Sequence, residues 1–173
     1  MTPTLDEYVA DARALEPEPF RQRHGDAFLV HHGPLGALRV PPKPQRTVTL
    51  EAVAAAAGLE PQRDYLVFPV RRSGRSAIAR FITVGRTRNN DVCIPYVSVS
   101  KFHAFFTQDA PGRFLLQDAG SHNGTLADDR TVPVHDQGRP VALQSGARIV
   151  LGAVKLTFLY AADFRELARR LGG

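Results

Sequence analysis

The chain has 173 residues, of which 43% are hydrophobic, and it contains 14 glycines and 13 prolines. No apolar run reaches the length of a transmembrane helix, which predicts a globular domain with extensions, and the many turn residues favour short elements over a helical bundle. Basic residues are concentrated after residue 60, because residues 1–60 hold six Lys/Arg against eight Asp/Glu, whereas residues 61–173 hold sixteen against nine.

The first sixty residues are expected to form an extension with two short helices and no recognisable chemistry. Thr4 and Glu7 have the spacing of a capping box, and the residues that follow predict a helix from about residue 5 to 15, ended by Pro17 and Pro19. Short strands are predicted at 28–30 and 38–40, and a second helix at 50–57. The N-terminus does not resemble a secretory signal, and the lone Cys93 cannot form an internal disulfide, so we expect a cytoplasmic location.

From about residue 65, apolar side chains recur at every second position, as in half-buried antiparallel strands. The runs with this pattern are Leu66/Phe68/Val70, Phe102/Ala104/Phe106, Phe114/Leu116 and Val154/Leu156/Phe158/Tyr160. Turn residues separate these runs at short intervals, which predicts a mainly β domain, an antiparallel β-sandwich over residues 61–160. Asp163 can cap a last helix within 161–173, and the apolar face of that helix is expected to pack on the sandwich.

Polar residues gather where these strands are expected to end. Gly85 and Arg86 follow an apolar strand, the segment 98–103 opens another strand, and the segment 121–125 forms a polar turn. Loops at one end of a sandwich converge on a rigid frame. An arginine, a serine, a lysine and an asparagine from three separate loops can therefore meet in one shallow site.

This pattern resembles the forkhead-associated (FHA) domain family, whose members bind phosphothreonine peptides. The resemblance runs from about residue 65 to 160, and the motif blocks occur in the family's order. The blocks are Gly85-Arg86, Asn90-Asp91, Ser100-Lys101-Phe102-His103, Ser121-His122-Asn123-Gly124-Thr125, Leu143 to Gly146 and Leu151-Gly152. Each block alone is weak evidence for the family. The resemblance depends on all blocks occurring in the family's order with predicted strands between them. The resemblance implies a β-sandwich of about eleven strands with recognition loops at one end.

The resemblance also implies roles for individual residues. The phosphate would be bound by Arg86, Ser100, Lys101 and His122, and the peptide backbone by Asn123. Lys101 stands where arginine is commoner in the family, which keeps the charge but loses the two-pronged guanidinium contact. For His122, a solvent-facing imidazole fits the sequence as well as a phosphate contact. The loops would be shaped by Gly85, His103, Ser121, Gly124 and Thr125, with Gly85, Gly124 and Gly152 supplying positive φ angles.

We therefore expect a non-catalytic adaptor, without a cofactor, that recognises phosphothreonine in a partner, either a Ser/Thr kinase or its substrate. The alternative is an FHA-like scaffold for phosphate-independent assembly, with residues 1–60 as an interface. Nucleic-acid binding through the arginines between residues 71 and 88 is not expected, because the chain has no Trp and only four Tyr to stack bases. Neither an enzyme nor a metal site is expected. Cys93 lies in an apolar run, and His24, His31 and His32 lack metal-site spacing.

Overall fold

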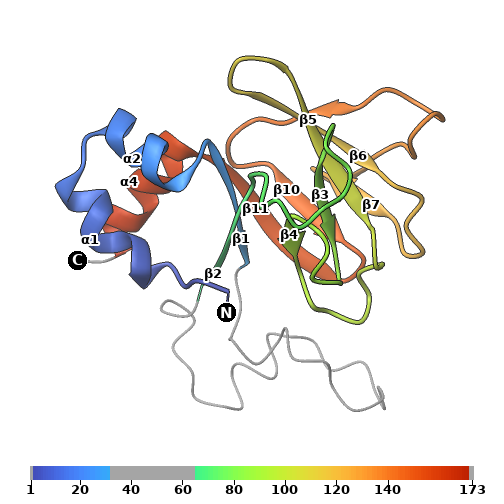
Figure 1. Cartoon of the computed structure of the whole chain (residues 1–173), viewed down its shortest axis with the longest axis horizontal. Coiled ribbons are helices and arrows are strands. Elements are labelled where there is room, and N and C mark those ends of the chain that lie inside the picture. Colours follow the sequence, from blue (N-terminus) through green and yellow to red (C-terminus); the bar gives the residue numbers. More distant parts are fainter. Residues whose placement is uncertain (1, 32–64, 172–173) are drawn as a thin grey trace.

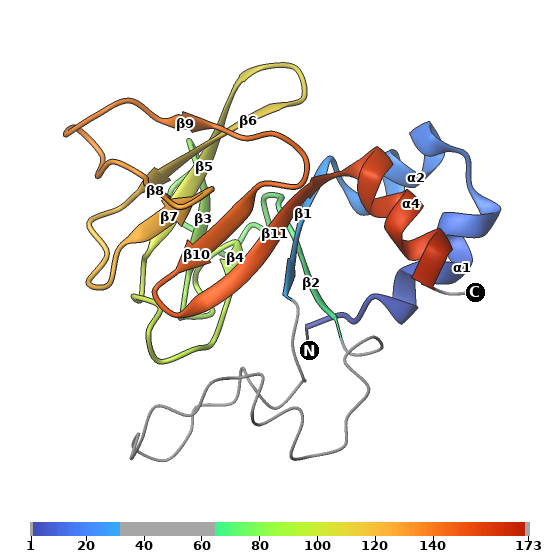
Figure 2. The same cartoon turned by 180° about the vertical axis from the view of Figure 1, so that it is seen from behind.

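The computed structural model describes residues 2–31 and 65–171. Two β-sheets form a sandwich, and three helices lie together beside one of the sheets (Figures 1 and 2). The helix expected at 50–57 and the strand expected at 38–40 fall outside the described residues. Among the described helices, none combines the length and the apolar character needed to cross a membrane.

The described strands number eleven, which confirms the expected mainly β sandwich. The six-stranded sheet has the order β2-β1-β11-β10-β7-β8, and the five-stranded sheet has the order β4-β3-β5-β6-β9. The first sheet contains β1 Ala27–His31, β2 Leu66–Pro69, β7 Thr125–Ala127, β8 Arg130–Thr131, β10 Arg148–Leu151 and β11 Val154–Tyr160; the second contains β3 Ile82–Gly85, β4 Val92–Cys93, β5 Ala104–Ala110, β6 Arg113–Asp118 and β9 Val141–Ala142. The pairing of β3 with β4 is parallel, whereas the other strand pairs are antiparallel.

The main core lies between the two sheets and is built from the alternating apolar positions. Phe106 on β5, Phe114 on β6 and Phe158 on β11 are fully buried there, and their ring centroids lie 5.9 to 6.3 Å apart. Such aromatic contacts contribute about 0.5–1.5 kcal/mol beyond area burial. This core fixes the sheet frame from which the loops at the strand ends project.

A second apolar cluster covers the outer face of β1 and β2. The helices α1 Asp6–Ala14, α2 Pro17–His24 and α4 Ala161–Leu171 form this layer. Phe164 of α4 stacks on Phe28 of β1 with ring centroids 4.0 Å apart. Strand β1 is therefore buried on both faces, with Leu29 in the main core and Phe28 under the helices. This explains its continuous rather than alternating apolar run.

Three details differ from the sequence analysis. The six-stranded sheet already includes β1, which pairs with both β11 and β2, so the sandwich crosses the boundary expected at residue 60. Pro17 and Pro19 do not simply end a helix, because they lie in the first turn of α2, where a missing N–H costs nothing. Finally, α4 continues directly from β11 and begins at Ala161, two residues before the expected cap, Asp163.

Candidate functional site

The end of β3 approaches the 100–101 loop unusually closely. The Arg86 N–H donates to the Ser100 carbonyl oxygen at 2.9 Å, and a Cβ added to Gly85 would lie 2.2 Å from the Lys101 carbonyl oxygen. Gly85 is thus required by this close approach, and not by the positive φ that the sequence analysis assigned to it, since the positive-φ glycines include Gly124 but not Gly85. The contact joins the two loops that carry Arg86 and Lys101.

Arg86 is half-buried as a residue, and its guanidinium is held by an uncharged acceptor. Its Nη1 donates to the Val97 carbonyl oxygen at 3.2 Å. Among the described residues, no carboxylate forms an ion pair with Arg86, and the same holds for the exposed ammonium of Lys101. Both cations therefore retain the capacity to bind an external anion.

Ser100 links this pair of loops to the 121–125 turn. Its Oγ accepts the His122 backbone N–H at 3.0 Å, which leaves the hydroxyl hydrogen able to donate to a ligand. The His122 imidazole is exposed, and its position is set through the backbone bond to Ser100. The structure therefore brings Arg86, Ser100, Lys101 and His122 into one group of contacting loops.

His103 connects the same loops through hydrogen bonds to their backbone. Its Nδ1 accepts the Ser100 N–H at 3.0 Å, and its Nε2 donates to the Gly124 carbonyl oxygen at 3.0 Å. This pattern requires the neutral imidazole with the proton on Nε2. Burial lowers the pKa of His103 below the usual value, although the bond to Gly124 acts in the opposite direction. The histidine therefore connects loops and has no free nitrogen for proton transfer.

Asn123 is exposed in the 121–125 turn. Its Nδ2 donates to the Ser98 carbonyl oxygen at 2.9 Å. Its second amide hydrogen and its carbonyl oxygen can still pair with a peptide backbone. The Ser98 loop is itself packed against Gly152, where an added Cβ would lie 2.3 Å from the Ser98 carbonyl oxygen, so Asn123 is held on a fixed support.

The sequence analysis missed Asp118, which organises the 121–125 turn. This buried carboxylate accepts the Gly120 and Ser121 N–H groups at 2.7 and 2.8 Å, and the Ser121 and Thr125 hydroxyls at 2.6 and 2.5 Å. Burial alone would raise the pKa of Asp118, but these hydrogen bonds outweigh it and keep the pKa below its usual value. The sequence does carry a signal for this role, namely an aspartate at the end of an apolar strand and three residues before a serine.

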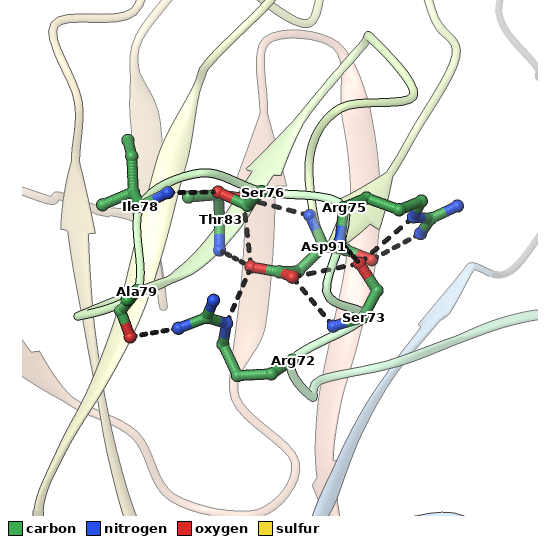
Figure 3. A network of polar contacts seen from close by, with 8 residues as sticks. All are labelled: Arg72, Ser73, Arg75, Ser76, Ile78, Ala79, Thr83 and Asp91. Carbon is green, nitrogen blue, oxygen red and sulfur yellow. Dashed lines mark hydrogen bonds and ion pairs between the residues drawn. The ribbon is translucent and has the colours of Figure 1, made fainter.

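A second buried carboxylate, Asp91, was given no role by the sequence analysis. It accepts the N–H and hydroxyl of Ser73 at 2.8 and 3.0 Å and those of Thr83 at 3.0 and 3.2 Å, and Arg72 approaches it at 3.5 Å (Figure 3). Burial opposes ionisation, but these hydrogen bonds keep the pKa of Asp91 below its usual value. The network ties the 72–76 loop to β3 and thereby positions Arg75.

The assembled group suits the binding of an oxyanion rather than bond cleavage. It offers a guanidinium, an ammonium and a hydroxyl. The His103 imidazole has a structural role, because both of its nitrogens are hydrogen-bonded to the backbone. In the described ranges 2–31 and 65–171, no three His, Cys, Asp or Glu side chains cluster as a metal site would require. Half-buried Cys93 has its thiol pKa raised by burial, which does not favour a nucleophile.

Comparison with known proteins assigns a family to this part of the chain. A sequence model of the FHA domain matches residues 82–152. Comparison with curated proteins gives no significant match.

Solved structures similar to this chain include Mycobacterium tuberculosis EmbR in complex with a low-affinity phosphopeptide, at 25% identity and a TM-score of 0.40, over 47% of this chain and 20% of that chain. An FHA domain of an Arabidopsis thaliana hypothetical protein is similar at 22% identity and a TM-score of 0.48, over 78% and 85% of the two chains. The FHA domain of the Chlamydia trachomatis CT664 protein is similar at 16% identity and a TM-score of 0.45, over 77% and 96%. This chain thus spans one fifth of the length of EmbR. The match to the FHA domain model covers residues 82–152, which carry the Arg86, Ser100 and 121–125 loops described above.

Proposed function

We propose that this chain is a non-catalytic adaptor that binds a phosphothreonine-containing segment of a partner protein. The observation that carries the proposal is a pair of cations, Arg86 and Lys101, on two loops that a backbone hydrogen bond from Arg86 to Ser100 joins. Neither cation is neutralised by a carboxylate among the described residues. The match of residues 82–152 to the FHA domain supports the same assignment.

Arg86 is the proposed main phosphate donor. A phosphothreonine carries about −1.5 to −2 charges at neutral pH, and hydrogen bonds to charged groups contribute roughly 1.5–3 kcal/mol each. The guanidinium is already oriented by its bond to the Val97 carbonyl, so little side-chain freedom is lost on binding. Ser100 would donate its hydroxyl to the same phosphate, and Lys101 would add a charge without a fixed two-pronged geometry.

Asn123 is proposed to hold the peptide backbone next to the phosphothreonine. Its remaining amide hydrogen and carbonyl oxygen can pair with one peptide group, which fixes the position of the segment without reading its sequence. His122 lies beside Ser100 through its backbone, so its exposed imidazole can reach the same ligand, most favourably when protonated. The partner in this proposal is a Ser/Thr kinase or a substrate of one.

The test begins with an oriented phosphothreonine-peptide library, which identifies a binding sequence for the full chain. Calorimetry with the selected peptide and its unphosphorylated twin then measures how much the phosphate contributes. We expect binding of the phosphorylated peptide alone. Equal affinity for both peptides would overturn the proposal, and self-association in size-exclusion chromatography without a phosphopeptide would favour a phosphate-independent scaffold.

A further inference from the structure

A cleft of about 790 Å³ opens beside the loop that carries Arg86. It lies between β2 and β4, the edge strands of the two sheets, which contact each other. Pro3 borders the cleft and accepts the Val67 N–H at 2.9 Å. The lining includes Arg75, Arg86 and Arg88, so one wall of the cleft is shared with the proposed phosphate donor.

The three arginines give the cleft a positive charge that is not neutralised locally. Arg75 is fixed by uncharged acceptors, with Nη2 donating to the Asp91 carbonyl oxygen at 2.7 Å and Nε donating to the Ser73 hydroxyl at 3.1 Å. Arg88 is exposed and pairs with no side chain within 2–31 and 65–171.

Asp91, the one acid in the lining, has a fully buried carboxylate. That carboxylate is directed to Ser73, Thr83 and Arg72, as Figure 3 shows. It therefore does not cancel the charge of the arginines that face the cleft.

Cys93 lies in the lining of this cleft together with Arg75 and Arg88. Burial raises the pKa of the Cys93 thiol, whereas the charges of Arg75 and Arg88 act in the opposite direction. The same thiol donates to the Arg86 carbonyl oxygen at 3.4 Å. Cys93 is half-buried and is the only cysteine in the chain, so its reactivity can report on occupancy of the cleft.

We propose that this arginine cleft, defined by Arg75, Arg86, Arg88 and Cys93, binds anionic side chains of the same peptide that carries the phosphothreonine. The proposal rests on the proposed function, because Arg86 belongs to both sites. A cleft of about 790 Å³ offers room for a short stretch of extended peptide next to the phosphothreonine. The anionic groups are carboxylates or a second phosphate within about three residues of the phosphothreonine.

The lining distinguishes this ligand from a single-stranded nucleic acid. Binding of unpaired bases normally uses exposed aromatic rings as stacking surfaces. Phe68 is the aromatic residue in the lining, and it is buried with 4% of its surface exposed. A strip of arginines without a stacking surface is suited to carboxylate or phosphate groups on a peptide.

The test uses the full chain and four peptides built around the same phosphothreonine. The reference peptide has three glutamines on each side of the phosphothreonine. Two acidic peptides carry glutamates in place of the glutamines, either before or after the phosphothreonine. In the fourth peptide, a second phosphothreonine replaces one glutamate of whichever acidic peptide binds more tightly. We expect glutamates on one side to tighten binding about fivefold over the glutamine peptide at low salt, and we expect the gain to fall with added salt. A gain from the second phosphothreonine identifies phosphate as an alternative source of the anion.

Two variants locate this gain. Arg88→Gln removes an exposed charge that has no structural partner in the described part of the chain, and it is expected to abolish most of the gain while leaving the affinity for the glutamine peptide unchanged. Arg139→Gln is the matched control, because Arg139 is exposed and precedes β9, at the opposite end of the five-stranded sheet from β4. A gain that is absent with both acidic peptides, or that persists in Arg88→Gln, would overturn the proposal.

Modification of Cys93 by an uncharged maleimide supplies a second readout. Saturation with the acidic peptide is expected to slow the reaction several-fold, and the glutamine peptide is expected to slow it less. Failure of the proposed function is distinguishable, since the glutamine peptide would then bind no better than its unphosphorylated twin. Oligonucleotide binding that Arg88→Gln weakens and the acidic peptide displaces would instead assign the cleft to nucleic acid.

Discussion

Removal of the Asp118 carboxylate tests whether this residue organises the 121–125 turn. The carboxylate accepts two backbone N–H groups and two hydroxyls, and Thr125 is fully buried. Asp118→Asn keeps the shape but replaces charge-assisted bonds by neutral ones and forces hydroxyls to reverse, so we expect a loss of about 2 kcal/mol in the free energy of unfolding. Asp118→Ala leaves buried donors unpaired and should cost about 4 kcal/mol.

Urea denaturation at neutral pH measures both losses, and acidification supplies a further check. The pKa of Asp118 lies below the ordinary aspartate value of 3.8, so its stabilising contribution is complete above that value and is lost as the pH falls toward the lower, folded-state pKa. The deficit of Asp118→Asn should therefore narrow as the pH falls below 3.8. A cost below about 1 kcal/mol for Asp118→Ala, typical of surface positions, would refute the reasoning.

The remaining predictions concern the loop contact, the bracing histidine and the helical layer. Gly85→Ala should lower the free energy of unfolding by about 2–4 kcal/mol and weaken phosphopeptide binding, because the new Cβ meets the Lys101 carbonyl oxygen at 2.2 Å. The control Gly112→Ala has open space around the new Cβ but a φ of 75°, and it should lower the free energy of unfolding by about 1 kcal/mol in the same urea experiment. Because the pKa of His103 is lowered, the free energy of unfolding should fall as the pH drops below the ordinary histidine value of 6.5. His103→Gln should remove part of this pH dependence in urea denaturation curves measured across that range. An unchanged dependence of the free energy of unfolding on pH would count against a buried neutral imidazole. Phe164→Ala should lower the free energy of unfolding by about 3–5 kcal/mol, with peptide affinity of the folded protein unchanged by calorimetry, and a large loss of affinity would show that the helical layer acts on the site.

The sequence predicted the sandwich better than it predicted the N-terminal part. Alternating apolar positions identified strands such as β6 and β11, because one face of each packs in the core and the other faces outward. A short strand was predicted at 28–30, within β1, but it was placed in the N-terminal extension and not in the sandwich, since burial on both faces removes the alternation. The prolines of α2 were ambiguous, because proline both ends helices and begins them.

Some site features could not be predicted, because they depend on contacts between distant loops. The close approach of Gly85 to the Lys101 carbonyl follows from the relative placement of two strands, and nothing local in the sequence specifies it. The four hydrogen bonds to Asp118 depend on how the following turn folds back. The arginine cleft likewise requires the edges of both sheets, so the run of arginines between residues 71 and 88 alone did not indicate it.

The most direct test of the central claim is a double-mutant cycle between Arg86 and the peptide phosphate. Calorimetry measures the affinities of the wild-type chain and of Arg86→Gln for the phosphothreonine peptide and its unphosphorylated twin. We predict a coupling free energy of about 2 kcal/mol or more, because a guanidinium–phosphate contact is charge-assisted on both sides. A coupling within about 0.5 kcal/mol of zero, in a variant that unfolds at the wild-type urea concentration, would contradict the assignment of this site.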